Sequence, residues 1–191
     1  WDSDLTKWDA MDMGPHRDIV GELGKAIKER EMKFVTSFHH ARKWFWYEVT
    51  YTKDKRHDTE DPKYAGANKI YPPVHTVKDS PTREYMQAWE DKIIEVIDKY
   101  EPDLLWFDGG LQKEKFWRSS QQKFDGHKRS FLSYYYNKGL KWGKEVGVTY
   151  KHEDLPKGAG ILDFERGRND SLSKFIWLTD TSIDEKSWSY V

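Results

Sequence analysis

Three carboxylates stand where the sequence predicts the ends of β-strands. Asp108 follows the apolar residues 104–107 and precedes two glycines, and Asp163 and Glu165 lie two positions apart in another short apolar segment. Side chains two positions apart on a strand point to the same face, so Asp163 and Glu165 are expected to share one side of a sheet. Glycoside hydrolysis needs such a pair of carboxyl groups, one to attack or to activate water and one to protonate the departing oxygen.

Each of these carboxylates also has a purely structural interpretation. Asp108 could form an Asp-Gly turn or cap a helix. Asp163 and Glu165 could instead pair with Arg166 and Arg168, which follow them directly. The residues alone leave both interpretations open.

Two histidines follow another predicted strand. No Asp or Glu stands at ligand spacing from His39 and His40, and no third ligand is evident, so the sequence predicts no metal site. Hydrogen bonding to a sugar hydroxyl is the expected role of the pair if the site is a carbohydrate pocket. Aromatic residues at 44–47, Trp177 and Trp188 could form either core or a sugar-stacking surface.

The elements that would position these side chains alternate along the chain. Helices are expected at about 17–30, 80–100 and 127–142, and strands at about 32–38, 103–108, 146–150, 158–165 and 175–178. Ser80 and Pro81 have the chemistry of a helix start, and residues 41–79 are expected to form one long functional loop.

This alternation predicts an α/β fold, either a (β/α) barrel or a doubly wound sheet. The sequence favours a (β/α)8 TIM-like barrel, because no glycine-rich phosphate loop follows any strand and charged residues follow several strands. A closed barrel needs eight strands, and only four or five are evident. Residues 1–191 are therefore expected to be the central portion of one catalytic barrel domain, with some βα units missing.

Composition excludes several classes of protein. Lys and Arg number 32 against 33 for Asp and Glu, which argues against nucleic acid as a partner. The absence of Cys excludes disulfide scaffolds, thiol catalysis and cysteine zinc sites. No apolar stretch approaches the roughly 20 residues of a membrane span, so no membrane partner is expected. Aromatic residues make up 16% of the chain, which weighs against disorder.

Several segments, in order along the chain, resemble the α-L-fucosidases of glycoside hydrolase family 29. The segments that carry the resemblance are Trp8 with 13–23 (MGPHRDIVGEL), 34–45, 100–110 with its Trp106-Phe107-Asp108, and 177–190 with its Thr-Ser-Ile. They extend over nearly all 191 residues.

The resemblance implies an exo-acting, retaining α-L-fucosidase that removes terminal α-L-fucose from a glycan through a covalent intermediate, without a cofactor. It implies that Asp108 is the nucleophile. Many relatives carry a Glu where Leu178 stands here, so the acid/base is expected to be Glu165, with Asp163 as second choice.

The resemblance also implies the residues that would hold the sugar. They are Trp106, Phe38, His39, His40, Trp44, Lys151 and Trp177. Lys151 stands where many relatives have Arg. Phe38 stands where many have Tyr, and His39 is expected to replace the missing hydroxyl.

Three further expectations accompany this assignment. The family resemblance favours a secreted or periplasmic enzyme, and a homo-oligomer is possible. The alternative hypothesis is a non-catalytic carbohydrate-binding module or an inactive remnant of a glycoside hydrolase barrel. Linkage and aglycone preference do not follow from the sequence.

Overall fold

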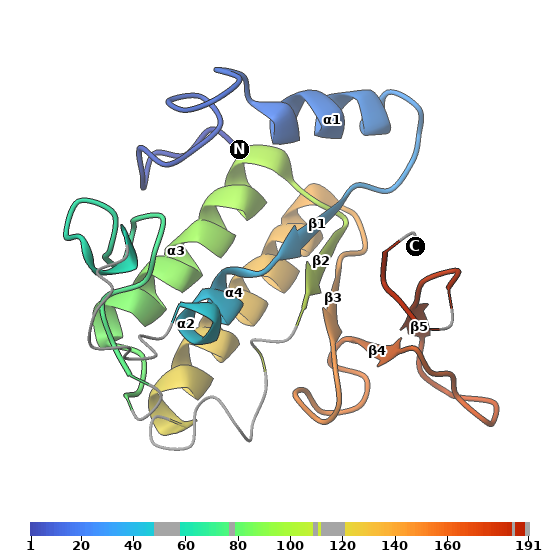
Figure 1. Cartoon of the computed structure of the whole chain (residues 1–191). Coiled ribbons are helices and arrows are strands. Elements are labelled where there is room, and N and C mark those ends of the chain that lie inside the picture. The colour runs from blue at the N-terminus through green and yellow to red at the C-terminus, as the bar shows by residue number, and fades with distance from the viewer. Residues whose placement is uncertain (48–57, 77–78, 109–110, 112–120, 185, 190–191) are drawn as a thin grey trace.

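The structure is a computed structural model that describes residues 1–47, 58–76, 79–108, 111, 121–184 and 186–189 (Figure 1). Its helices are α1 (Ile19–Lys28), α2 (Lys43–Trp46), α3 (Arg83–Tyr100) and α4 (Gln121–Trp142), with short 3-10 turns η1 (His40–Arg42) and η2 (Asp58–Glu60). Its strands are β1 (Val35–Phe38), β2 (Leu104–Phe107), β3 (Gly147–Tyr150), β4 (Ile161–Glu165) and β5 (Trp177–Asp180).

The strands form one parallel sheet in the order β1-β2-β3-β4-β5. A doubly wound sheet reverses its strand order at a switch point, and the described strands show no such reversal. Neighbours in sequence are neighbours in space, as in a (β/α) barrel. The sheet is not closed, so the expected barrel is not confirmed and the structure supports the coarser assignment of a parallel α/β fold.

Helices α3 and α4 run side by side along one face of the sheet (Figure 1). They make the crossovers from β1 to β2 and from β2 to β3, which parallel neighbours require. The connections from β3 to β4 and from β4 to β5 contain no helix. Within the described part of the chain, the helical layer therefore covers the first three strands only.

Local chemistry explains where the helices begin and end. The Asp18 side chain accepts a hydrogen bond from the Gly21 backbone and caps α1. Thr82 caps α3 by accepting from the Tyr85 backbone, so α3 starts after Thr82 instead of at Ser80 as expected. The helix ends at Tyr100, and the next residue, Glu101, caps it in a left-handed conformation (φ 46°).

Three other boundaries differ from expectation. The last strand lies at 177–180, about two positions later than expected, and α4 begins at Gln121, before the expected start. The expected loop at 41–79 contains the short helical segments η1, α2 and η2, while its residues 48–57 and 77–78 lie outside the described residues.

The core lies between the sheet and the two long helices. Side chains from α3, α4 and the strands have no exposed surface there, namely Ile93, Ile97, Leu105, Phe131, Tyr135 and Val148. Phe107 packs its ring against Trp89 of α3 and Phe131 of α4, with centroids 6.2 and 5.5 Å away. These contacts hold β2, the strand that Asp108 follows, against the two helices. None of the described helices is long and apolar enough to cross a membrane.

We expect Ile97→Ala to lower the free energy of unfolding by about 2–5 kcal/mol, because it leaves a cavity at a fully buried position of α3. Urea unfolding of the two proteins measures the difference. Leu140→Ala on α4 is the control, since Leu140 is 80% exposed and its loss should change stability by no more than about 0.5 kcal/mol. Equal effects of the two substitutions would contradict the packing described above.

Candidate active site

Four charged side chains meet where strands β2 to β5 end. Asp108 directly follows β2, Lys151 directly follows β3, and Glu165 and Asp180 are the last residues of β4 and β5. Parallel strands present their carboxyl ends at one edge of a sheet, so residues distant in sequence converge there. Glu165 is also in register with Asp180 across the β4–β5 pair.

The ammonium group of Lys151 is the centre of this cluster. Its Nζ lies 3.2 Å from Asp108 Oδ1, 2.8 Å from Glu165 Oε2 and 3.3 Å from Asp180 Oδ2, and its side chain is only 3% exposed. Burial alone would lower the pKa of Lys151, but hydrogen bonds to Glu165 and Asp108 outweigh it, so this pKa lies above its ordinary value. Lys151 is therefore a buried cation that ties three strand ends together.

Asp108 has two further basic neighbours from the segment after β1. Arg42 donates through Nε to the Asp108 carbonyl at 2.8 Å, and its Nη2 lies 3.5 Å from Asp108 Oδ1. His39 Nε2 lies 3.4 Å from Asp108 Oδ2. Both oxygens of the carboxylate are thus contacted from two sides, and the group is held in one orientation.

Trp106 joins this cluster to a second, more buried carboxylate. Its Nε1 donates to Asp163 Oδ2 at 2.9 Å, and its ring centroid lies 5.2 Å from the Lys151 ammonium. Asp163 is 3% exposed, and within the described chain its Oδ1 is buried without a hydrogen-bond partner. Burial raises the pKa of Asp163 above its ordinary value, although the bond from Trp106 acts in the opposite direction.

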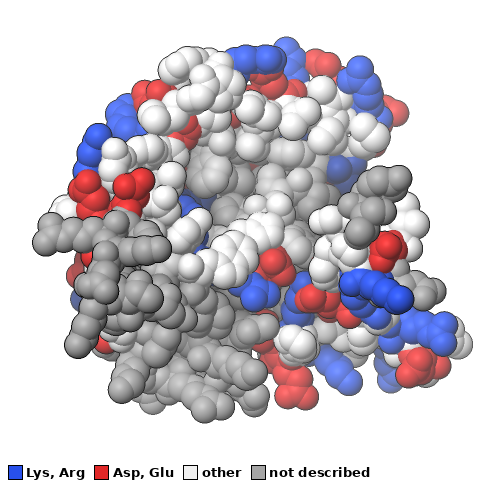
Figure 2. Space-filling model, viewed as in Figure 1, with Lys and Arg blue, Asp and Glu red and all other residues white. Residues whose placement is uncertain are grey.

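The charges around the cluster are mixed in sign. On the face in Figure 2, acidic and basic side chains are interspersed, and several of both signs meet near the centre of the view. The cluster itself contains Asp108, Asp163, Glu165 and Asp180 against the two permanent cations Lys151 and Arg42. It is therefore rich in carboxylate, a balance that favours a developing positive charge in a ligand.

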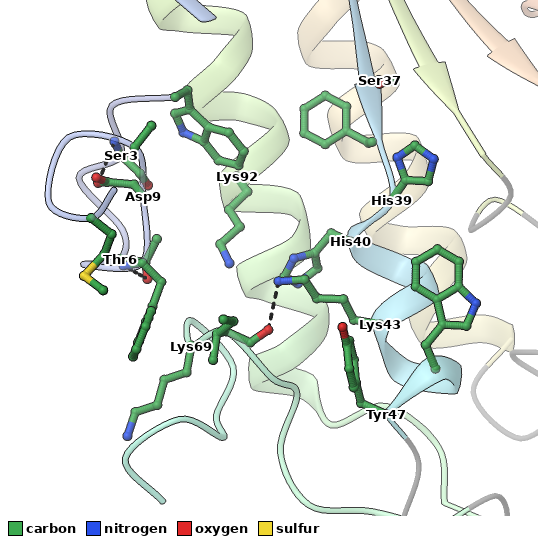
Figure 3. A pocket seen from close by; sticks show the side chains of 17 residues that line it. Ser3, Thr6, Asp9, Ser37, His39, His40, Lys43, Tyr47, Lys69 and Lys92 are labelled. Atoms are coloured by element: carbon green, nitrogen blue, oxygen red, sulfur yellow. Dashed lines mark hydrogen bonds between the residues drawn. The ribbon is translucent and has the colours of Figure 1, made fainter. Parts of the chain in front are cut away.

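A pocket of about 570 Å³ lies on the other side of His39 (Figure 3). His40, Lys43 and Lys92 line it together, and Lys43 donates to the Ile70 carbonyl at 3.1 Å. Burial lowers the pKa of His40 well below its ordinary value, and the charges of Lys92 and Lys43 lower it further. Burial also lowers the pKa of Lys92 to about 8. His39 therefore borders both this pocket and Asp108, whereas His40 lines the pocket and is buried.

No group of three His, Asp or Glu side chains in the part of the chain that the structure describes could hold a metal ion. The carboxylates of the cluster are instead bound to basic side chains and to the Trp106 ring nitrogen. What the arrangement offers chemically is a set of carboxyl groups in different surroundings, with Asp108 contacted by cations and Asp163 buried. Such a difference suits one group to nucleophilic attack and another to proton transfer.

Residues 1–191 match the family model described as Alpha-L-fucosidase. The chain belongs to the alpha-L-fucosidase family. It is 27% identical to the tissue alpha-L-fucosidases of Macaca fascicularis and Homo sapiens over 205 aligned residues. Each match covers 100% of this chain and 35% of the relative, so the chain spans about a third of their length.

The fold is also similar to a solved structure. The crystal structure of Thermotoga maritima alpha-fucosidase in complex with a mechanism-based inhibitor superposes with a TM-score of 0.54 and 23% identity. The match covers 94% of this chain and 33% of that one. At this identity the similarity concerns the fold alone, and it agrees with the sequential parallel sheet.

The family assignment can be set beside the positions of the predicted site residues. Asp108, Glu165, Lys151, Trp106 and His39 come together at the strand ends. Asp163 lies beside them through Trp106, so Asp163 and Glu165 reach the same cluster, as their spacing predicted.

Three of the predicted sugar-binding rings lie elsewhere. Trp44 is 3% exposed and stacks on His75 with centroids 3.7 Å apart, so neither face is open to a ligand. Phe38 is 7% exposed, packed on Phe107 in the core. Trp177 lies three residues from Asp180 on β5 and therefore on its opposite face, where it contacts Phe164. Trp44 and Phe38 are therefore packed in the interior, while Trp177 is 38% exposed on the face opposite Asp180. A role for these three rings in sugar binding stays a prediction.

His40 also lies apart from the charged cluster, and its role in sugar binding stays a prediction. It stacks on Tyr85 with centroids 5.0 Å apart and lines the neighbouring pocket together with His39. Among the described residues its Nε2 has no hydrogen-bond partner. His39 precedes η1 and His40 is its first residue, so the two rings lie where the chain turns out of β1.

The sequence missed three residues of the site. Asp180 was missed because the last strand was expected to end two positions earlier, and Arg42 because it lay in an expected loop. Trp46 was missed in favour of Trp44, although two positions along a helix turn the side chain by about 200°. Trp46 is 59% exposed, and its ring lies nearly parallel to that of His39 with centroids 6.4 Å apart. Helical periodicity over 43–46 was the signal that could have distinguished the two.

We expect Asp163→Asn to change the pH dependence of stability. A carboxyl group whose pKa is raised on folding favours the folded state below its unfolded pKa, and this contribution is lost as the pH rises through the folded pKa. The unmodified chain should therefore lose stability relative to the variant between about pH 3 and about pH 7. Urea unfolding across this range measures the difference.

Asp170→Asn is the matched control, because Asp170 is 94% exposed and lies outside the cluster. Its difference from the unmodified chain should stay nearly constant across the same range. A difference for Asp163→Asn that is equally independent of pH would contradict the raised pKa.

Proposed function

We propose that residues 1–191 form part of the catalytic domain of an exo-acting, retaining α-L-fucosidase, with Asp108 as nucleophile and Glu165 as acid/base. The observation that carries the proposal is the shared contact of these two carboxylates with Lys151. Oxygens that lie 3.2 and 2.8 Å from one nitrogen are no more than about 6 Å apart. Retaining glycosidases hold their two carboxyl groups about 5–5.5 Å apart, which this upper bound accommodates.

In the first step Asp108 attacks the anomeric carbon of fucose. A bond forms between the carboxylate oxygen and this carbon while the bond to the glycosidic oxygen breaks, and Glu165 gives its proton to that oxygen. The Asp108 carboxylate is contacted by Lys151, Arg42 and His39, which would keep it oriented for the attack. The positive charge that develops on the sugar is stabilised by the surplus of carboxylates around it.

In the second step the fucosyl–Asp108 ester is hydrolysed. Glu165 removes a proton from water as the water oxygen attacks the anomeric carbon, and Asp108 leaves as a carboxylate. Fucose is released with its anomeric configuration retained. Each residue ends the cycle in the protonation state in which it began.

Exposure supports Glu165 over Asp163 as acid/base. The Glu165 side chain is 48% exposed and can reach a glycosidic oxygen, whereas the free oxygen of Asp163 is buried. Asp163 remains the second choice because its pKa is raised. A row of rings, Trp46, His39 and Trp106, borders Asp108 and offers apolar surface to a sugar.

The proposed substrate is a glycan with terminal α-linked fucose, in line with the names of the relatives. A secreted or periplasmic location, homo-oligomer formation and a reaction without a cofactor stay predictions. A non-catalytic carbohydrate-binding module is the alternative that the experiments must separate.

Asp108→Gly should reduce the release of 4-nitrophenol from 4-nitrophenyl α-L-fucoside on the order of 10⁴-fold, because the nucleophile is gone. Added azide should restore turnover and form fucosyl azide, since a small anion fits the space of the missing carboxylate. Asp170→Gly at the exposed surface is the control and should leave activity unchanged. Undiminished hydrolysis by Asp108→Gly would contradict the assignment of Asp108 as nucleophile.

Calorimetry with fucose on the same samples distinguishes the enzyme from a non-catalytic carbohydrate-binding module. Binding of fucose with no hydrolysis by the unmodified protein would support the carbohydrate-binding module. Binding together with hydrolysis supports the enzyme.

Glu165→Gln should slow alkyl α-L-fucosides by about 10²–10⁴-fold, because a poor leaving group needs a proton from the enzyme. With the nitrophenyl substrate the rate of the first step should fall far less, because nitrophenolate leaves without protonation. Steady-state kinetics with both substrates measure the two losses, and the exposed Glu153→Gln serves as control. Equal losses for the two substrates would point to another acid, and the same measurement on Asp163→Asn would then test Asp163.

A further inference from the structure

Asp180 is a carboxylate of the cluster to which the proposed mechanism assigns no step. It ends β5, its Oδ2 lies 3.3 Å from Lys151 Nζ, and its side chain is 28% exposed. Its backbone carbonyl accepts from the Arg166 amide at 2.8 Å, which holds the end of β5 against the residue after β4. Asp180 is thus placed by the strand pairing beside Glu165.

The hydrogen-bonding capacity of Lys151 explains what this position does. An ammonium group has three N–H donors and no acceptor. Asp108, Glu165 and Asp180 lie within 3.3 Å of Nζ, one carboxylate for each donor. With all three donors occupied, the ammonium is held at one point between the strand ends.

The charges that face Glu165 make Asp180 more than a packing contact. Lys151 is the cation that contacts Glu165, while Asp108, Asp163 and Asp180 are the carboxylates of the same cluster. Arg42 and His39 contact Asp108 on its other side. Arg166, next in the chain after Glu165, donates to Ser182 and places its guanidinium over the Trp188 ring at 4.3 Å.

A general acid must hold a proton before the reaction, yet an ammonium at 2.8 Å favours the ionised form of a carboxyl group. A further carboxylate that contacts the same ammonium favours the protonated form of Glu165. It shares the positive charge of the ammonium and places a second negative charge near Glu165. Asp180 is the residue in this cluster that has such a contact and no assigned step in the reaction.

We propose that Asp180 is a positioning residue: it shares the ammonium of Lys151, keeps it between Asp108 and Glu165, and thereby leaves Glu165 able to carry the proton that the leaving group needs. The catalytic part of this inference rests on the proposed function. The part that concerns the Lys151 contact and the proton on Glu165 does not.

The test is a titration of Glu165 in Asp180→Asn, which keeps the shape of the side chain and removes its charge. Carbon NMR of protein labelled at the glutamate carboxyl carbons follows the titration, and the missing signal in Glu165→Gln identifies Glu165. The midpoint of Glu165 should fall by about 0.5–1 pH unit in Asp180→Asn. Asp170→Asn, which removes an exposed carboxylate outside the cluster, should leave it unchanged.

Activity supplies the second measurement. The alkaline limb of the pH profile of kcat/KM, where the acid loses its proton, should move to lower pH in Asp180→Asn by the same amount. Asp180→Glu, which restores the charge, should bring the limb back towards its original position. A residue that only supports the fold would change the amplitude of the profile and leave the limb in place.

The outcomes separate the inference from the proposed function. An unchanged or raised midpoint of Glu165 in folded Asp180→Asn overturns the role of Asp180, whatever the activity. A lowered midpoint in a protein that hydrolyses no α-L-fucoside supports the role of Asp180 and rejects the enzyme. If Asp180→Asn does not fold, the same titration on Asp180→Ser decides between these outcomes.

Discussion

One buried ammonium group organises the carboxyl edge of this sheet. Lys151 is 3% exposed, and burial of an uncompensated charge costs several kcal/mol, so the fold depends on what surrounds Nζ. The compensation comes from three different strands, β2, β4 and β5, because no single strand could place three carboxylates around one point. Correct pairing of the whole sheet is therefore a condition for burying Lys151, and the buried cation in turn favours the correct register.

The sheet makes this convergence possible with short elements. The first three strands, of four residues each, pack on α3 and α4 against fully buried side chains such as Ile97 and Phe131, and charged residues follow β2 and β3 at their carboxyl ends. Asp108 is an example, because Phe107 is fixed in the core and the next residue is the proposed nucleophile. A rigid apolar interior thus positions a charged edge, which is a requirement for pre-organised catalysis.

How much of this could be predicted from sequence differs between the fold and the site. Apolar runs that end in charged residues were sufficient to predict the α/β alternation and to single out Asp108, Asp163 and Glu165. Lys151 was predicted only from the family resemblance. Aromatic side chains were harder, since a Trp at the surface and a Trp in the core have the same letter. Trp44 and Trp46 differ only by their angle around a four-residue helix, and Trp177 differs from Asp180 only by the face of a strand. Such distinctions need the element boundary to within one residue, and sequence patterns place boundaries less closely than that.

No helix lies between β3 and β4 or between β4 and β5, so the strands of the site differ in how firmly they are held. The strands that precede Asp108 and Lys151 pack against the long helices. Strands β4 and β5 are held mainly by pairing with β3 and with each other, and they have few buried side chains. Elements with little buried surface open at lower free-energy cost than the core, so amide protons of β4 and β5 should exchange with solvent before those of β2. The strand end that carries Glu165 is therefore held less firmly than the one that carries Asp108, and the ion pairs of Lys151 connect the two.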